Sequence, residues 1–234
     1  RRDVRTALRL ANNSAPCPDG IPYGAWRALG DMGIDILFAA SKFLITVERE
    51  DRLQQDYPTF NESLLHFLPK KPIGKTGGGA AVFDPGGVRP LNVTNADNRL
   101  FASTIQLALE PILEPPITHQ QMRFLSGRSM LANVLDVDEA RATQAATGPL
   151  AMAFFYDYAS AFPNIEQQLL HQFFRHLGWP EWLLRAIRVL YWSNFCTICL
   201  WGARFSGFQI SRGIWQGALY RHFSLRQQRT SCCE

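Results

Sequence analysis

One carboxylate stands where a structural role does not explain it. Asp157 lies near the end of residues 150–158, which read L-A-M-A-F-F-Y-D-Y, and a short apolar run of this kind predicts a buried central strand. Burying a carboxylate is costly unless it is hydrogen-bonded, paired or bound to a cation, and functional sites cluster at strand ends. The alternative is that Asp157 caps the following turn, and the run alone leaves both interpretations open.

A glycine-rich segment, residues 74–79, offers a second kind of chemistry. Gly74-Lys75-Thr76 is similar to the end of a phosphate-binding P-loop, but Pro69 stands where that motif requires its first glycine. The tip of a mobile hairpin is therefore favoured over a nucleotide-hydrolysing loop.

The five cysteines argue against a disulfide framework, because the number is odd and the spacing uneven. They indicate a reducing compartment, so we expect an intracellular protein, with nucleus and cytoplasm both open. Cys196 and Cys199 have a C-x2-C spacing, yet Cys232 and Cys233 are adjacent and suit a tetrahedral zinc site poorly. Small buried side chains are the favoured interpretation of the pair.

Composition favours a folded chain, and the charge distribution is compatible with binding to nucleic acid. The apolar fraction of 47% is enough for a core, and no stretch is long enough to span a bilayer. From Tyr158 onward there are 8 Arg, no Lys and 3 Glu, which suits phosphate contacts or a solvated surface equally. The chain opens on Arg1 without Met or a signal peptide, so we expect a fragment of a longer protein.

Periodicity and breakers predict the elements that would position these residues. Helical patterns occupy residues 23–49, 100–113, 130–146, 164–177 and 180–190, with Asn164 as a predicted N-cap and Gly178 beyond the C-terminus of the fourth. The last two are expected to be core helices. Strands are expected at residues 64–68 and 88–93, and a hairpin at residues 195–201 and 205–210.

The residues around Asp157 resemble the first catalytic motif of reverse transcriptases, especially those of non-LTR retrotransposons. The matching run is F-Y-D-Y-A-S-A-F-P-N-I at residues 155–165, and D-x3-A-F is its specific part. Further segments resemble other motifs of the family in the correct order, so the resemblance covers residues 15–217. They are A-P-C-P-D-G-I-P at 15–22, L-P-K-K at 68–71 with R-P-L at 89–91, residues 121–133, and R-G-I-W-Q-G at 212–217.

The resemblance implies an α+β right-hand polymerase, fingers plus a partial palm, truncated before the second catalytic carboxylate motif. Residues 1–148 would be a fingers-like region and residues 149–217 the partial palm. Residues 218–234 do not continue the family pattern, and we expect an atypical tail that is frame-shifted or disordered.

The resemblance also implies roles for single residues. Asp157, with the carbonyl of Tyr158, would hold the Mg²⁺ ions of two-metal nucleotidyl transfer. Phe162 would lie under the incoming sugar and exclude a 2′ hydroxyl, although core packing is the alternative. Gln216 and Gly217 would lie beside the nascent base pair.

The resemblance also implies that basic side chains contact the incoming nucleotide. Arg89 would contact the triphosphate, with Lys70 and Lys71 as weaker candidates, and a solvated surface charge is the alternative for Arg89. The implied partners are an RNA template, a DNA primer and dNTPs, with no membrane. Protein partners cannot be inferred.

The chain also departs from the family pattern. The second carboxylate contribution, an A-D-D hairpin, is missing, because no Asp follows Asp157 and the later acids are Glu166, Glu181 and Glu234. We therefore expect a fragment of an RNA-directed DNA polymerase that is inactive as it stands. The alternative is a non-catalytic retroelement remnant that at most binds RNA or DNA.

Overall fold

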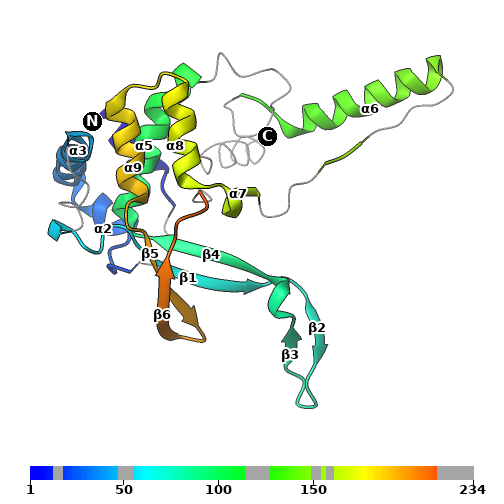
Figure 1. Cartoon of the computed structure of the whole chain (residues 1–234), viewed down its shortest axis with the longest axis horizontal. Helices are drawn as coiled ribbons and strands as arrows, with labels where there is room; N and C mark the ends of the chain where they lie inside the picture. Colours follow the sequence, from blue (N-terminus) through cyan, green and yellow to red (C-terminus); the bar gives the residue numbers. More distant parts are fainter. Residues whose placement is uncertain (13–17, 47–54, 114–126, 149–153, 157–160, 215–234) are drawn as a thin grey trace.

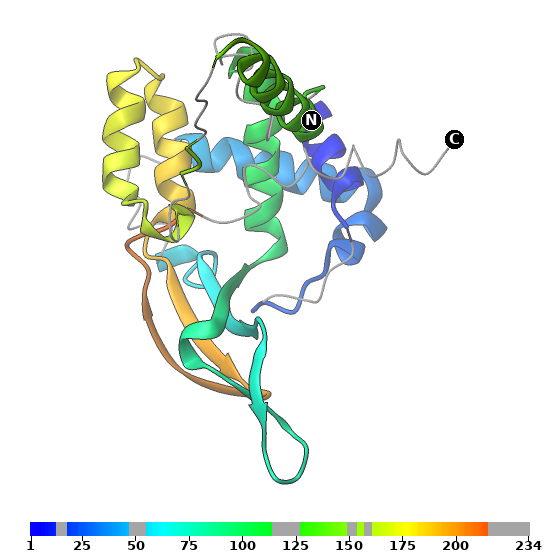
Figure 2. The same cartoon turned by 90° about the vertical axis from the view of Figure 1, so that its right-hand side faces the viewer.

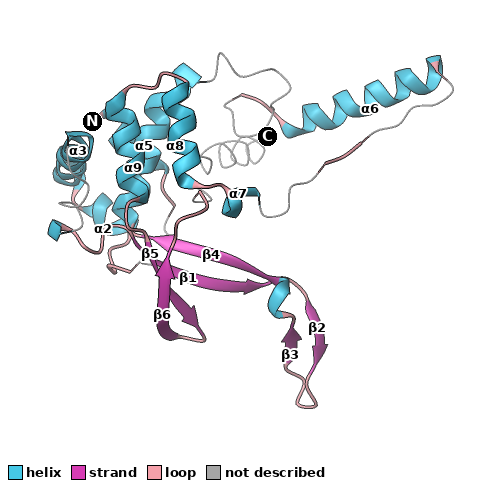
Figure 3. Cartoon of the chain, viewed as in Figure 1, coloured by secondary structure: helices cyan, strands magenta, loops and turns pink. Residues whose placement is uncertain are grey.

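The computed structural model describes residues 1–12, 18–46, 55–113, 127–148, 154–156 and 161–214. Within them helices and strands are mixed, and the strands form a sheet, as the α+β prediction expects (Figures 1 and 3). The helices are α1 (Arg2–Leu10), α2 (Tyr23–Ala28), α3 (Gly30–Thr46), α5 (Ala96–Leu113), α6 (Met130–Thr147), α7 (Ala161–Asn164), α8 (Gln167–His176), α9 (Glu181–Tyr191) and the 3-10 turn η1 (Pro85–Gly87). The strands are β1 (Glu62–Pro69), β2 (Pro72–Lys75), β3 (Ala81–Phe83), β4 (Val88–Thr94), β5 (Phe195–Leu200) and β6 (Ala203–Gln209).

One four-stranded sheet has the order β4-β1-β5-β6. β1 is antiparallel to β4, with Leu64 opposite Val93, and parallel to β5, with Leu64 opposite Thr197. β5 and β6 form the predicted hairpin, whose turn residues Trp201 and Gly202 have φ of 52° and 83°, the left-handed conformation that tight hairpin turns use. Strands from both sides of the predicted boundary after residue 148 thus share one sheet, and the boundary itself stays a prediction.

Helices α1, α3, α5 and α9 gather at one end of this sheet around a hydrophobic core. Figure 2 shows α8 and α9, in yellow and amber, beside the green α5 and above the strands. The core is built from α1, α3, α5, α9 and neighbouring residues, and its buried side chains include Leu8, Leu37, Leu100, Phe101, Val189 and Leu190. Burial of these apolar side chains drives the packing of helices that lie far apart in sequence.

A network of buried amides joins this helical core to the sheet. Asn61, just before β1, donates to the carbonyls of Val189 and Trp192 at the end of α9, at 2.8 and 2.6 Å. Its own carbonyl oxygen accepts from Asn98 of α5 at 2.8 Å. Because both asparagines are at least nine-tenths buried, these bonds satisfy polar groups that water does not reach. Periodicity predicted β1, α5 and α9, but not the asparagine side chains that connect them.

The start of α8 differs from the prediction. Asn164 is the last residue of α7, Glu166 is extended, and α8 begins at Gln167, so the predicted N-cap at Asn164 is wrong. Gly178 does lie beyond the C-terminus with a φ of 75°, as predicted.

The prediction that α8 is a core helix is also wrong. None of its described side chains is buried, and Leu169 and Phe173 are 62% and 54% exposed. Within the described chain, the main packing partner of α8 is α9. The core prediction for α9 is confirmed, since Leu183, Leu184 and Val189 are buried.

The predicted central strand at residues 150–158 lies mostly outside the described residues. Its described part, Phe154, Phe155 and Tyr156, is not in a strand, and these side chains are 70–85% exposed. The strand prediction is wrong for these three residues, because a strand needs a hydrogen-bonded neighbour and no described strand pairs with them.

Other expectations are confirmed. The helical patterns at residues 23–49, 100–113 and 130–146 correspond to α2 with α3, to α5 and to α6, and the strands at 64–68 and 88–93 lie within β1 and β4. Cys196 is fully buried and its thiol donates to the carbonyl of Phe208, in agreement with a small core side chain, whereas Cys199 is only half-buried, so the prediction for the pair is confirmed for Cys196 alone. No helix in the described ranges combines the length and apolarity needed to cross a membrane.

Candidate functional site

The predicted triphosphate contacts lie together at the far end of β1 and β4. Arg89 of β4 is opposite Leu68 of β1, and the backbone N–H of Lys70 donates to the carbonyl of Gly87 at 3.0 Å, which extends the same ladder. Lys70 comes directly after β1 and Arg89 is the second residue of β4, so the paired ends of the two strands bring their backbones close together. Lys71 is next along the chain.

This cation cluster, Lys70, Lys71 and Arg89, carries a net positive charge at an exposed position. All three side chains are exposed, and no ion pair involving them occurs within the described residues. Asp84 stands at the N-cap position of η1, between the hairpin and β4. An exposed group of cations attracts phosphate more strongly than scattered charges would.

The glycine-rich segment forms the tip of the β2–β3 hairpin, which projects beyond the cation cluster (Figure 1). Thr76 closes the turn, since its backbone N–H donates to Ala80 and its carbonyl accepts from Gly79, each at 2.8 Å. Gly79 has a φ of 83°, which glycine adopts readily. A P-loop leads into a helix, so this strand-turn-strand geometry confirms the hairpin and excludes that motif.

The start of the R-G-I-W-Q-G segment is anchored beside the residues that follow Phe162. The N–H of Gly213 donates to the carbonyl of Ile165 at 2.6 Å, and the Gln167 side chain donates to the carbonyl of Gly213 at 3.1 Å. Gly213 is buried with a φ of 94°, a conformation that disfavours other residues. Two predicted motif segments therefore meet, with Phe162 in α7 just before the contact.

Four predicted site residues, Asp157, Tyr158, Gln216 and Gly217, lie outside the described residues, and their roles stay predictions. Within the described ranges no group of three or more His, Cys, Asp or Glu side chains could hold a metal ion. The structure thus brings together the members of the cation cluster in one place and Ile165 with Gly213 in another. It gives no geometry for the predicted metal ligands.

A titratable group that the sequence did not point to lies at the start of α5. Burial raises the pKa of the Asp97 carboxyl to about 6, the N–H of Asn98 partly opposes this, and the charge of Asp19 adds to it. Asp19 is held in place because its backbone N–H donates to the Asn95 side chain at 3.2 Å. Asp19 belongs to the A-P-C-P-D-G-I-P segment, so the described part of this segment contacts the residues where α5 begins.

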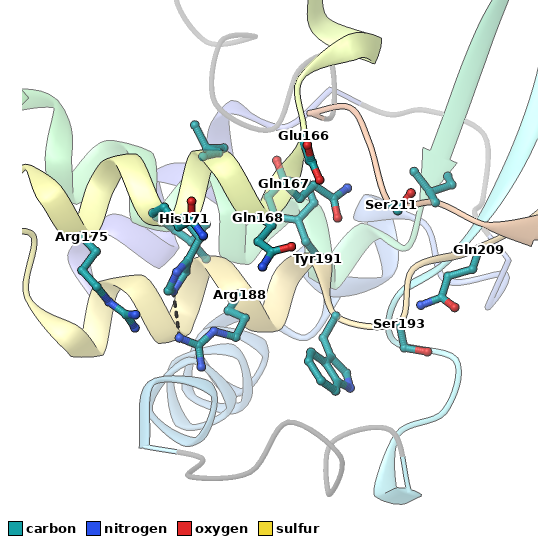
Figure 4. A pocket seen from close by; sticks show the side chains of 15 residues that line it. Glu166, Gln167, Gln168, His171, Arg175, Arg188, Tyr191, Ser193, Gln209 and Ser211 are labelled. Atoms are coloured by element: carbon teal, nitrogen blue, oxygen red, sulfur yellow. Dashed lines mark hydrogen bonds between the residues drawn. The ribbon is translucent and has the colours of Figure 1, made fainter.

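A pocket of about 620 Å³ lies between α8, α9 and the end of β6 with the residues that follow it (Figure 4). Glutamine side chains, two arginines and a histidine contribute to its lining. The sequence analysis missed this pocket, because one wall is α8, which was predicted to be a core helix, and another is the end of β6.

Comparison with protein families identifies a match. Residues 68–225, about two thirds of the chain, match the family model described as reverse transcriptase (RNA-dependent DNA polymerase). The matched range includes the cation cluster, Asp157, Phe162 and the segment at residues 212–217. No curated protein matches the chain.

Proposed function

The chain belongs to the reverse transcriptase (RNA-dependent DNA polymerase) family, and from this we propose that it forms the fingers and part of the palm of a non-LTR retrotransposon enzyme. The family match over residues 68–225 carries this proposal. The motif order along residues 15–217, with D-x3-A-F at Asp157, supports the non-LTR subtype. Residues 1–148 are proposed as fingers and residues 149–217 as partial palm. The partners are an RNA template, a DNA primer and dNTPs.

We propose that the cation cluster binds the triphosphate of the incoming dNTP. Three observations support this role: the exposure of all three side chains, the pairing of β1 with β4 that brings Arg89 to Lys70, and the lack of ion pairs to them in the described part of the chain. Arg89 is the main contact, because a guanidinium stays charged and offers two parallel N–H donors to phosphate oxygens. Lys70 and Lys71 add charge without that geometry.

We propose Asp157 and the carbonyl of Tyr158 as ligands of Mg²⁺. A carboxylate and a carbonyl are oxygen donors of the kind that Mg²⁺ takes, so the donor types fit the ion. When bound, Mg²⁺ supplies charge for nucleotidyl transfer. In this proposal Phe162 contacts the incoming sugar, and Gln216 and Gly217 lie beside the nascent base pair. The anchoring of Gly213 at Ile165 supports this, because it ties the beginning of one segment to the end of the other.

These 234 residues alone are proposed to be inactive in polymerisation. No Asp follows Asp157, and one carboxylate cannot position two metal ions. The later acids do not replace the missing pair. Glu181 lies at the start of α9, 3.8 Å from Arg175 and Arg188, and the backbone of Glu166 pairs with that of Arg212 in an isolated β-bridge.

A second candidate function is non-catalytic binding of single-stranded RNA or DNA. The hairpin of β5 and β6 favours it, since Trp201 is fully exposed and Phe205 and Phe208 are about half exposed beside Arg204. Exposed rings on which bases stack, together with a nearby guanidinium, are typical of surfaces that bind single strands without sequence preference.

Primer extension separates the two candidates. We compare the 234-residue chain with a fusion that adds an A-D-D hairpin and the remaining palm and thumb of a related enzyme, using an RNA template, a DNA primer, dNTPs and Mg²⁺. The fusion should incorporate dNTPs and lose at least about a thousandfold of that rate in Asp157→Ala, because a metal ligand is removed. The chain alone should incorporate none.

Two outcomes would contradict the polymerase proposal. Incorporation by the unfused chain that survives Asp157→Ala would reject both the role of Asp157 and the proposed inactivity. A folded fusion without activity that still binds RNA in a salt-dependent manner would favour the non-catalytic candidate.

A further inference from the structure

A second pocket, of about 240 Å³, lies where α1, α3, α5 and α9 meet. We call it the apolar pocket, because most of its lining is hydrocarbon. The lining includes Phe38, Leu44, Phe101, Leu109, Trp182 and Leu190. Packed protein interiors rarely leave a space much larger than a water molecule, so a space of this size beside the core is unusual. None of its lining residues belongs to the cation cluster or to the predicted metal ligands.

The hydroxyl groups in the lining are already used as donors. Ser41 of α3 donates to the carbonyl of Phe38 at 2.8 Å, and Thr104 of α5 donates to the carbonyl of Leu100 at 2.8 Å. Each hydroxyl has a single proton, so neither can donate to a ligand while these bonds last. A polar ligand would therefore give up hydrogen bonds to water and gain few in return.

The two charged side chains of the lining come from the beginning of α1. Arg1 forms an ion pair with Asp35 of α3, which already compensates its charge. Asp3 is half-buried and carries the opposite charge to Arg1. Because both signs occur at the same place, the pocket does not strongly favour an ion of either sign.

The apolar pocket reaches from the surface into the core. At its rim the Trp182 side chain of α9 is 46% exposed, and Ala108 of α5 is exposed as well. Deeper in the lining, Ala186 and Leu190 of α9 are buried. A small molecule can therefore enter from solvent and bury apolar surface against the core without separating the helices.

We propose that this pocket binds an uncharged apolar molecule about the size of one substituted aromatic ring. A cavity of about 150 Å³ lined by aliphatic and aromatic side chains is enough for benzene, so this pocket has room for a ring with an alkyl substituent. Binding is driven by the transfer of apolar surface out of water and by dispersion contacts.

The position of the pocket gives its ligand a structural effect. α1 and α3 precede the residues that match the reverse transcriptase family, whereas α5 and α9 lie within them. A ligand that contacts all four helices ties the beginning of the chain to the family domain. It should therefore stabilise the folded chain, because it binds the folded state and not the unfolded one.

Isothermal titration calorimetry of the 234-residue chain tests the chemistry with toluene, benzoate and benzylamine, which share a ring and differ in charge. Toluene should bind saturably and at least about tenfold more tightly than either charged analogue, because the pocket does not replace the hydration of an ion. Saturating toluene should also raise the unfolding temperature in scanning calorimetry.

A variant that fills the pocket tests the location. Thr104→Leu should weaken toluene binding by about tenfold or more, because the larger side chain takes the space of the ligand. Leucine is a good helix former and this position is half-buried, so the variant should fold. Thr147→Leu on the exposed α6 is the matched control. The Thr147 hydroxyl likewise donates to the carbonyl four residues earlier at 2.8 Å, and toluene affinity should not change.

A second filling variant guards against misfolding of the first. Ala108→Leu adds bulk at the exposed rim and should also weaken toluene binding, whereas Ala142→Leu on α6 should not. Circular dichroism checks that each variant folds.

Tryptophan fluorescence gives an independent readout at the rim. Toluene should shift the emission to shorter wavelength, because it displaces water from the exposed indole ring of Trp182. Trp182→Phe should lose this shift and keep the toluene affinity within about threefold, since a phenyl ring still supplies an apolar wall.

Several results would overturn the proposal. They are the absence of saturable toluene binding, an affinity for benzoate or benzylamine equal to or higher than that for toluene, equal losses in a filling variant and its control on α6, and an emission shift that persists in Trp182→Phe.

Discussion

Single residues in this chain take their chemistry from their surroundings. Asp97 lies at the N-terminus of α5, a position that stabilises acids, yet burial and the charge of Asp19 raise its pKa to about 6. The unfolded chain would release this proton near the ordinary value of 3.8. Between these two values the folded state binds one more proton than the unfolded state, so the stability falls as pH rises through this window.

Asp97→Asn should therefore stabilise the protein at neutral pH. The substitution keeps an oxygen that accepts from the Asn98 N–H and removes the charge that burial disfavours. Urea denaturation near pH 7.5 should show a gain of about 1–2 kcal/mol, allowing for the solvent that reaches this half-buried group. The gain should disappear at about pH 3, below both pKa values, where the carboxyl is mostly protonated in the folded and in the unfolded state. Asp138→Asn on the exposed α6 is the control, and an equal gain there would contradict this origin.

The pairing of neighbouring strands requires a close approach of their backbones, which the Cβ of a single added side chain can block. A Cβ at Gly207 of β6 would lie 1.5 Å from the carbonyl oxygen of Cys196 in β5, and backbone atoms cannot move aside as a flexible side chain can. At Gly78, in the β2–β3 turn, the nearest atom is the Thr76 hydroxyl oxygen at 3.9 Å. An added Cβ should therefore be tolerated at Gly78 and not at Gly207.

Gly207→Ala should separate β6 from β5 and cost about 3 kcal/mol or more, because overpacking against backbone forces the strands apart. Gly78→Ala, the matched control, should change stability by less than about 1 kcal/mol. Thermal unfolding followed by circular dichroism measures both. A Gly207→Ala variant as stable as the control would show that the pairing near Cys196 is looser than described.

The whole molecule is held together by contacts between segments that are distant in sequence. β1 pairs in parallel with β5, and Asn61, next to β1, binds the carbonyl groups at the end of α9. The sheet and the helical core therefore share one polar junction. Breaking it removes the Asn61 donor from both carbonyl groups in a largely buried position, which costs more than the loss of an exposed hydrogen bond.

Asn61→Ala should lower the free energy of unfolding by about 2–3 kcal/mol, since it deprives Val189, Trp192 and Asn98 of a partner. Asn12→Ala, at an exposed position after α1, should change it by less than about 0.5 kcal/mol. Chemical denaturation of both variants provides the measurement. Similar values for the two would mean that the junction does not couple sheet and helices.

The sequence by itself determined the family, through D-x3-A-F and the ordered segments around it, and it predicted the strands around Arg89 and the hairpin after α9. These features depend on neighbours within a few positions, so residue order encodes them directly. The N-cap at Asn164 and the core role of α8 were wrong, because a local pattern does not say which element will cover a helical face. Only the tertiary structure placed Arg89 beside Lys70, Gly213 beside Ile165 and Arg188 against His171. Those contacts arise from strand pairing and helix packing between distant segments, which depend on the free energy of the whole fold rather than on any short stretch of chain.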